Sequence, residues 1–455
     1  MPIPPRLPSA HSACLRSFYG RAADTGAVKQ GGDAGSAMER PASGIASLER
    51  AAVEAAGDFA RVGAAGVLAV DAACFAPIGR RYGGAPHEEV LARLAAFLRD
   101  KVGALLADSD RICLGEMGRD EVLVIFLRDR HDAHFYREVL PALTRDVGAA
   151  LHSQGSRIAY PYASDDARPH AGCAPILHDP TLRPDTLLRR ARDLALEDAA
   201  LRARVDASAR RERFLSLLFS ESVRVVFEPI VKLESKQVLG YEALVRGEPG
   251  SEFASPAQLF AAATECDALF ELDCLCRRTA LRAADRLPEG AKLFLNCLPS
   301  AIHDPSLQDS ALRDLLARYK LRPSDVVFEI SERESIDNFA VFREVCDHYS
   351  ALGFQIALDD VGVGYSSLEA VTELAPDYLK VDMSFVRGIH EDPARQEILK
   401  ALTSIAWRID ARIIAEGIET DAELKTLREL AISYGQGYRI GRAGELQREG
   451  GTPKG

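Results

Sequence analysis

Eight short apolar runs recur between residues 223 and 438, and this repetition constrains the fold more than any other feature of the sequence. Each run is rich in β-branched or aromatic residues, and most are followed by a stretch long enough for a helix. The runs are VRVVFEPIV, YEALVR, KLFLNCL, VVFEIS, FQIALDD, YLKVDMS, RIIAEGI and SYGQGY. Eight strands with helical connections predict a (β/α)8 barrel of TIM type. Only KLESKQVLG lies between the first two runs, so we expect a hairpin there and one irregular strand.

Polar side chains stand at the end of nearly every run. The C-terminal ends of the strands in such a barrel form a single rim, so these side chains are expected to converge on one cavity. Any one of them alone is more simply explained as a polar residue where the chain leaves the core. The whole set is Glu242, Arg246, Asn296, Glu329, Glu332, Asp359, Asp360, Lys380, Asp382, Glu416, Glu419 and Gln436.

The carboxylates in this set favour a bound cation. Asp359 and Asp360 are adjacent after a buried run, where they repel each other and lose solvation unless a positive charge compensates. Oxygen ligands without histidine or cysteine favour Mg²⁺ or Mn²⁺ over zinc. The sequence therefore predicts a site for a hard divalent cation at the barrel rim.

The motifs YEALVR, LNC, FEISE, LDDVGVGYSSL, LKVD, AEGIE and YGQGY follow one another in order between Arg211 and Leu446. They resemble the successive motifs of EAL-domain phosphodiesterases, and seven ordered motifs are far more specific than any one tripeptide. The resemblance implies metal-dependent hydrolysis of cyclic di-GMP to linear pGpG in bacterial second-messenger signalling. A catalytically silent cyclic di-GMP receptor or scaffold acting through protein contacts, and a barrel enzyme for another phosphodiester, remain as alternatives.

The resemblance also implies roles for single residues. Lys380 would position or polarise the attacking water, and Asp382 would orient Lys380. Glu332 would hold the loop from Val361 to Ser367. Two Mg²⁺ or Mn²⁺ ions per active site would be held by Glu242, Asn296, Glu329, Asp359, Asp360 and Glu416, the last as a ligand or a base. The ligand would meet Arg246, Glu228 and Gln436.

Two departures from the family pattern favour the silent alternative. Glu228 stands where the family usually has glutamine, and its charge beside an anionic ligand is expected to weaken binding. Val361 and Val363 replace the usual Phe and Thr of the loop after the paired aspartates, so signalling through that loop is expected to differ.

The region from Gly66 to about Ala200 alternates strand-like and helix-like runs, which predicts an α/β domain with a hairpin in RICLGEMGRDEVLVIFL. It resembles a degenerate GGDEF domain. Asp71 is kept, but Ala73 replaces its partner carboxylate and Arg119 replaces the second glycine, so synthesis of cyclic di-GMP is not expected. Asp120 and Glu121 remain at the turn, so GTP binding there stays open. We prefer a regulatory or dimerising role, with a protein regulator as a possible partner.

These patterns divide the chain into a disordered tail (1–45), a GGDEF-like domain (46–200), a helical linker (201–220) and an EAL domain (221–446). A long helix is predicted from Thr186 to Phe219, since no Gly or Pro interrupts it. The resemblance implies a homodimer formed through the EAL domain.

Composition limits the partners and the compartment. The net charge of -11 argues against a nucleic-acid polymer, which requires a clustered basic surface. No apolar run approaches the roughly 18 residues of a membrane span, and the start of the sequence lacks the apolar core of a signal peptide. We therefore expect a cytoplasmic protein without a membrane partner. The nine cysteines are scattered, and we expect reduced thiols.

Overall fold

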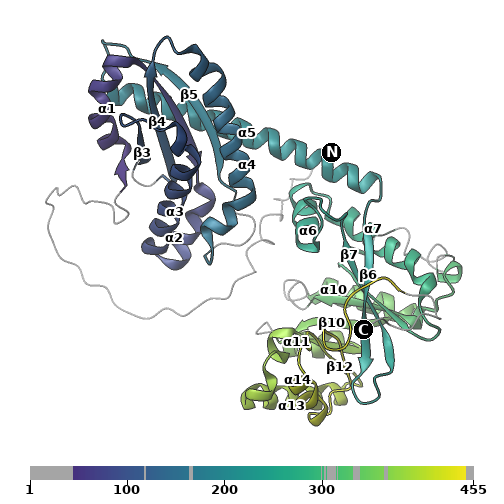
Figure 1. Cartoon of the computed structure of the whole chain (residues 1–455). Helices are drawn as coiled ribbons and strands as arrows, with labels where there is room; N and C mark the ends of the chain where they lie inside the picture. Colours follow the sequence, from purple (N-terminus) through teal and green to yellow (C-terminus); the bar gives the residue numbers. More distant parts are fainter. Residues whose placement is uncertain are drawn as a thin grey trace, which may run out of the picture. The chain divides into compact units, whose positions relative to one another are not determined.

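The computed structural model describes residues 45–116, 119–162, 168–298, 300–301, 304, 314, 316–331, 339–362 and 367–446. The chain divides into two compact units, which meet in the sequence between Arg202 and Ala203. Helix α5, Pro184–Phe219, begins in the first unit and ends in the second, and it confirms the long helix predicted from the sequence (Figure 1). The residues expected to form a helical linker are the last turns of α5. The tail expected before Ile45 lies outside the described residues.

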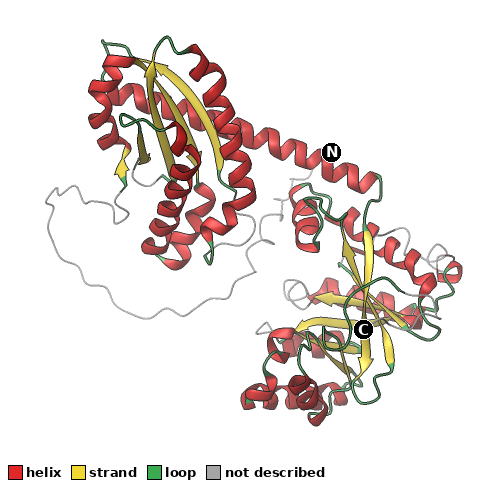
Figure 2. Cartoon of the chain, viewed as in Figure 1, coloured by secondary structure: helices red, strands yellow, loops and turns green. Residues whose placement is uncertain are grey.

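The first unit is built on a five-stranded sheet with the strand order β1-β3-β4-β2-β5 (Figure 2). Strands β3 and β4 pair antiparallel, which confirms the predicted hairpin, and β2 is antiparallel to both β4 and β5. The strands are β1 Ala46–Ser47, β2 Gly63–Asp71, β3 Arg111–Leu114, β4 Glu121–Asp129 and β5 His170–Leu177.

Helices cover both faces of this sheet. Successive side chains of a strand point to opposite faces, so the uninterrupted apolar run of β4 serves two cores. Its residues 122, 124 and 126 pack with α2 Ala76–Tyr82, α3 Gly84–Val102 and α4 Leu140–Ala159. Its residues 123, 125 and 127 pack with α1 Leu48–Val62 and the first part of α5. The predicted α/β architecture is confirmed, while its assignment as a GGDEF domain stays a prediction.

The second unit contains a closed eight-stranded barrel, and all eight predicted runs form its strands. Strand β6 pairs antiparallel with both of its neighbours, β7 and β13, which confirms the predicted hairpin and the irregular strand. The strands are β6 Arg224–Lys232, β7 Val238–Arg246, β8 Lys292–Asn296, β9 Val326–Ser331, β10 Gln355–Val361, β11 Tyr378–Val381, β12 Arg412–Ala415 and β13 Tyr434–Gly435.

Helices connect the strands and pack around the barrel (Figure 1). Two of them begin with a reciprocal capping box, in which a hydroxyl and a side chain three residues later satisfy the first backbone N–H groups. The helices are α6 Pro256–Glu265, α7 Leu269–Ala283, α10 Phe339–Ala351, α11 Ser367–Leu374, α12 Met383–Val386, α13 Pro393–Arg408 and α14 Asp421–Glu429.

A layer of apolar side chains fills the barrel interior. Its members are Ile230, Phe294, Val327, Ala357, Tyr378 and Ile414, and the rings of Phe294 and Tyr378 meet edge to face at 5.4 Å. Residues two positions apart in a strand point to the same side. The residue two positions after five of these members therefore lies inside, one layer nearer to the C-terminal rim. Those five residues are Asn296, Glu329, Asp359, Lys380 and Glu416.

Within the described residues, no helix combines the length and apolar character needed to cross a membrane. The eight cysteines in the described part of the chain are all free thiols.

Candidate active site

Lys380 lies at the centre of the polar layer. Its Nζ is 2.8 Å from both Glu329 Oε1 and Glu416 Oε1, 3.2 Å from Asp359 Oδ1 and 3.3 Å from Glu242 Oε2. The lysine side chain is 1% exposed. Burial opposes its charge, but the carboxylates of Asp359, Glu242 and Glu329 prevail and raise the pKa of Lys380 well above its usual value. Four carboxylates thus share one ammonium group.

Two amides orient the carboxylate of Glu242. Gln436 Nε2 donates to Glu242 Oε2 at 2.7 Å and to Glu416 Oε1 at 3.3 Å, while Asn296 Nδ2 donates to Glu242 Oε1 at 3.3 Å. Burial alone would raise the pKa of Glu242, but Lys380 and these two donors hold it below its usual value. Glu242 is therefore the carboxylate that this layer favours as an anion.

The other carboxylates are less well compensated. Burial, together with the charge of Glu242, raises the pKa of Glu329 well above its usual value. Burial also raises the pKa of Glu416, despite its contact with Lys380. Among the described residues, Glu329 Oε2 has no hydrogen-bond donor. When all four are ionised, these carboxylates carry more negative charge than Lys380 balances, so a further cation would favour the ionised state.

The backbone departs from regular strand geometry directly after Asp359. The pairing of β10 with β11 is irregular between Leu358 and Val361, and Asp360 within it adopts a φ of 60°. A residue other than glycine in this left-handed region costs of order 1–3 kcal/mol, and such residues cluster at functional sites. This outlier supports a functional role for the paired aspartates.

A glycine leaves room for the turn that follows Glu416. Gly417 has a φ of 65°, and a Cβ at this position would lie 2.4 Å from Cβ of Met383. Glycine is the residue that fits both the left-handed conformation and this close approach. The backbone N–H of Glu416 also donates to the carbonyl of Val381 at 3.0 Å. The backbone of Glu416 is therefore fixed by this hydrogen bond as well as by the turn at Gly417.

The structure brings together five of the six expected metal ligands: Glu242, Asn296, Glu329, Asp359 and Glu416. Their oxygen donors suit Mg²⁺ or Mn²⁺. Within the described residues, however, no three His, Cys, Asp or Glu side chains are already arranged as a metal site. The carboxylates converge on the Lys380 ammonium instead. The ligand role of Asp360 stays a prediction.

Two expected ligand contacts lie beside this layer. The β6–β7 pairing sets Glu228 directly opposite Glu242, and burial followed by the charge of Glu242 raises the pKa of Glu228. Arg246 is the last residue of β7, and its Nη1 donates to the carbonyl of Val245 at 2.7 Å. The positive charge of Arg246 lowers the pKa of Glu228 and so opposes the effect of burial. The contacts of both side chains with a ligand stay predictions.

One predicted role needs correction. Asp382 was expected to orient Lys380, but its carboxylate accepts from the N–H of Ser384 at 2.9 Å and caps helix α12. Strand β11 ends at Val381, so the alternation that would have placed Asp382 beside Lys380 stops before it. The ligand contact of Gln436 stays a prediction; the residue is buried, and its amide nitrogen donates to Glu242 and Glu416.

The remaining expected positions contribute less to the site. Glu419 forms an ion pair with Arg387 at 2.5 Å, and both side chains are largely exposed. Glu332 and Val363 lie outside the described residues, so the predicted hold on the loop is not addressed.

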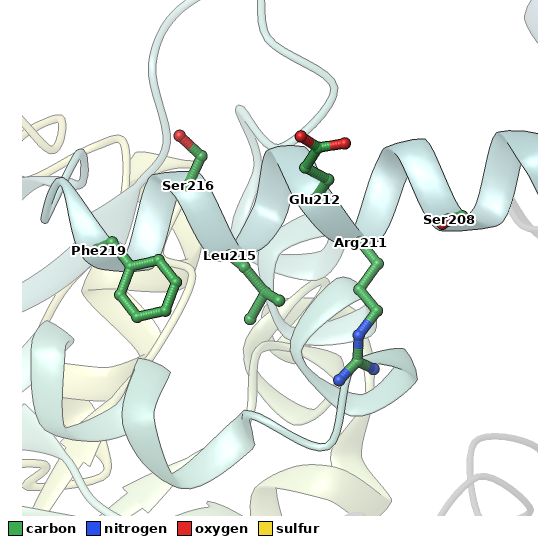
Figure 3. A pocket seen from close by; sticks show the side chains of 6 residues that line it. All are labelled: Ser208, Arg211, Glu212, Leu215, Ser216 and Phe219. Atoms are coloured by element: carbon green, nitrogen blue, oxygen red, sulfur yellow. The ribbon is translucent and has the colours of Figure 1, made fainter.

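A shallow depression is lined by residues of the last turns of α5 (Figure 3). Figure 3 shows the side chains of Leu215 and Phe219 on one side of the helix and those of Glu212 and Ser216 on the other. The lining residues are Ser208, Arg211, Glu212, Leu215, Ser216 and Phe219. None of the carboxylates around Lys380 lines it, so we do not assign a ligand to this depression.

Comparison with known proteins places the barrel in a family. Residues 211–443, about half of the chain, match the family described as EAL domain. The chain is 34% identical over 221 residues to PdeG of Escherichia coli K12, named a probable cyclic di-GMP phosphodiesterase, covering 47% of this chain and 43% of that protein. It is 29% identical over 232 residues to PdeN of the same organism, also named a probable cyclic di-GMP phosphodiesterase, covering 49% and 43%.

The sequence of one solved structure is about as similar to this chain as the two curated relatives are. The cyclic di-GMP-bound form of a standalone EAL protein from Vibrio cholerae O395 is 32% identical, covers 49% of this chain and 92% of that one, and gives a TM-score of 0.44. The chain spans less than half the length of the curated relatives named above. The family match covers the whole barrel, from its first strand to its last, and it includes every member of the polar layer. The chain therefore belongs to the EAL domain family.

Proposed function

We propose that this chain hydrolyses cyclic di-GMP to linear pGpG in bacterial second-messenger signalling, using two Mg²⁺ or Mn²⁺ ions. The observation that carries the proposal is the convergence of four carboxylates on Lys380 at the C-terminal rim of the barrel. Two relatives named as probable cyclic di-GMP phosphodiesterases support the choice of substrate.

The chain's own residues suit the steps of such a hydrolysis. Bound metal ions would supply Lewis acidity to the phosphodiester. Lys380 would direct a water toward phosphorus, and Arg246 would pair with a ligand phosphate. The ions would be held by Glu242, Asn296, Glu329, Asp359, Asp360 and Glu416, with Gln436 keeping Glu242 and Glu416 in place.

We further propose the setting in which this activity operates. The protein would act in the cytoplasm, as a homodimer formed through the EAL domain. Its first unit would be a degenerate GGDEF domain that takes GTP or a protein regulator. The family relationship and the α/β sandwich of the first unit support these proposals.

The purified full chain with Mn²⁺ or Mg²⁺ is expected to convert cyclic di-GMP to pGpG and to form no cyclic di-GMP from GTP. Chromatography of the reaction mixtures measures both outcomes, and a chelator is expected to stop hydrolysis. Folded, metal-saturated protein that binds cyclic di-GMP but releases no pGpG would establish the receptor alternative instead. Glu228, with its raised pKa beside Glu242, is the observation that favours this second candidate.

Replacing Glu228 by glutamine is expected to tighten cyclic di-GMP binding by about 1 kcal/mol, roughly fivefold in Kd, because it removes a negative charge near the ligand phosphates. Calorimetry in the presence of a chelator measures Kd without turnover. The matched control is Glu234→Gln, an exposed glutamate in the turn of the same hairpin, which should leave Kd unchanged. Unchanged or weaker binding by the Glu228 variant would show that this carboxylate faces away from the ligand.

A further inference from the structure

A buried group of charged side chains lies on the outer side of strand β8, separate from the cluster around Lys380. Arg277 on α7 contacts the carboxylate of Asp273 one turn earlier through Nη1, and its Nη2 lies 3.1 Å from Asp304 Oδ2. The three side chains are 1%, 5% and 3% exposed, respectively. We call Asp273, Arg277 and Asp304 the α7 triad.

Stability alone is a weak reason for such a group. Taking charges out of water costs free energy that their mutual attraction often fails to recover, and apolar residues of similar volume frequently serve as well. Burial raises the pKa of Asp273 to about 6 even beside Arg277, which shows how strongly this environment opposes the charge. A buried charged group is better explained by fixing the position of the segments that it joins.

The α7 triad holds the segment that follows Asn296. The carboxylate of Asp273 faces the backbone N–H of Leu298, two residues after Asn296, and this N–H opposes the rise that burial causes in the pKa of Asp273. Backbone hydrogen bonds link Leu298, Ala301 and Asp304, because Ala301 donates to the carbonyl of Leu298 and Asp304 donates to the carbonyl of Ala301, both at 2.9 Å. Asp304 returns to Arg277 through its side chain. Leu298 and Asp304 therefore both lie against side chains of α7.

The same segment is tied to the neighbouring strand of the site. The N–H of Cys297 donates to the carbonyl of Glu329 at 2.9 Å, which continues the parallel β8–β9 pairing one residue beyond Asn296. A shift of this segment would therefore move Asn296 relative to Glu329. These are two of the proposed metal ligands.

We propose that Asp273, Arg277 and Asp304 are positioning residues that set the alignment of Asn296 and Glu329 for metal binding. The inference rests on the proposed function for its choice of metal. The triad acts through the backbone: Asp273 faces the N–H of Leu298, and Nη2 of Arg277 also lies 3.4 Å from Sγ of Cys274 on α7.

The test measures Mn²⁺ affinity of the full chain by calorimetry, with Mn²⁺ alone as the probe. Arg277→Met is expected to weaken Mn²⁺ binding about 10- to 100-fold, the range for residues that orient metal ligands from outside the coordination sphere. The variant kcat at saturating Mn²⁺ should change much less than the Mn²⁺ concentration for half-maximal rate. The control Arg278→Met removes a neighbouring, partly exposed arginine that pairs with Glu221 at 3.2 Å, and it should bind Mn²⁺ as the unmodified chain does.

A second variant separates positioning from folding. The triple change Asp273→Leu, Arg277→Met and Asp304→Asn leaves no unpaired buried charge, so it is expected to fold even if Arg277→Met does not. It still removes the acceptor for the Leu298 N–H, so its Mn²⁺ affinity should remain at least about 10-fold weak. The milder Asp304→Asn variant should weaken binding in the same direction.

Triple-variant affinity within twofold of the unmodified chain, with the fold retained, would overturn the proposal. An equal loss in Arg278→Met would overturn it as well. If the unmodified chain binds Mn²⁺ but hydrolyses no cyclic di-GMP, the proposed function fails while the affinity comparison still decides the role of the triad. If the unmodified chain binds no Mn²⁺, both proposals fall.

Discussion

Replacing Lys380 by methionine is expected to lower the free energy of unfolding of the metal-free protein by about 3–5 kcal/mol, because it leaves buried carboxylates without their shared ammonium. Those carboxylates belong to Glu242, Glu329, Asp359 and Glu416. Urea unfolding in the presence of a chelator measures the change. Hydrolysis of cyclic di-GMP should fall by at least about 100-fold, the loss usual for a buried group that stabilises developing charge.

The loss of stability in the Lys380→Met variant is expected to depend on pH and on added metal. Burial raises the pKa of Glu329 and of Glu416 in the folded protein. Protonation of these two groups therefore stabilises the fold, fully so below their unfolded-state pKa. This stabilisation is lost as the pH rises through their folded-state pKa. Without the Lys380 ammonium, protonation of these carboxylates stabilises the fold by more. The difference from the unmodified chain should therefore be smaller in acid than at neutral pH, and added Mn²⁺ should recover part of it.

The matched control for this change is Lys400→Met. Lys400 lies on the surface of α13, where it pairs with Glu397 at 2.7 Å and is 53% exposed, so its removal should cost no more than about 1 kcal/mol. An unfolding midpoint for Lys380→Met equal to that of the unmodified chain in chelator would contradict the central role given to Lys380. It would mean that the carboxylates are neutral in the metal-free protein.

The barrel and most of its site follow from short-range features of the sequence. The alternation of two in β8 to β12 fixes both the apolar interior layer and the polar layer above it, so Phe294 predicts the direction of Asn296 and Tyr378 that of Lys380. The short connection before Val238 is too small for a crossover helix, so it dictates the antiparallel start of the barrel.

The prediction failed where the strands end. Asp382 follows Lys380 by two residues, but it lies beyond the last residue of β11 and caps a helix instead. An aspartate can cap a helix or end a strand, so the residue type alone does not show which of the two Asp382 does. The contacts of Gln436 could not be predicted either, since the sequence shows that an amide reaches the rim but not which carboxylates it meets.

The α7 triad was missed because its members look ordinary in the sequence. Asp273 and Arg277 are four residues apart on a helix, a spacing that usually marks a solvent-exposed ion pair. Asp304 lies 27 residues after Arg277, and no periodicity connects them. Burial of such a pair depends on the tertiary packing of α7 against β8, which the local pattern does not encode.

The first unit holds a buried contact of the same kind. The sequence predicts Glu121 at the turn of a degenerate nucleotide-binding site. In the structure, Nη2 of Arg192 on α5 lies 2.6 Å from Oε1 of Glu121, and both side chains are 3% exposed. A Cβ at Gly115 would lie 1.8 Å from this oxygen, so glycine leaves the room that Glu121 occupies. The carboxylate is thereby neutralised from within the chain, so of the two regulators proposed for this unit the contact favours a protein over GTP.

Replacing Arg192 by methionine is therefore expected to destabilise the first unit by about 3–5 kcal/mol, since it leaves the Glu121 carboxylate buried and unpaired. Hydrogen exchange of amides in β4 and in the first half of α5 measures the loss where the contact lies. The double variant Arg192→Met with Glu121→Gln should recover much of it, because no buried charge then remains. Arg190→Met, at an exposed position on the same helix, is the control and should leave exchange unchanged. Unaltered protection in the single variant would show that Glu121 reaches water or a proton by another route, and the turn would again be open to a cation.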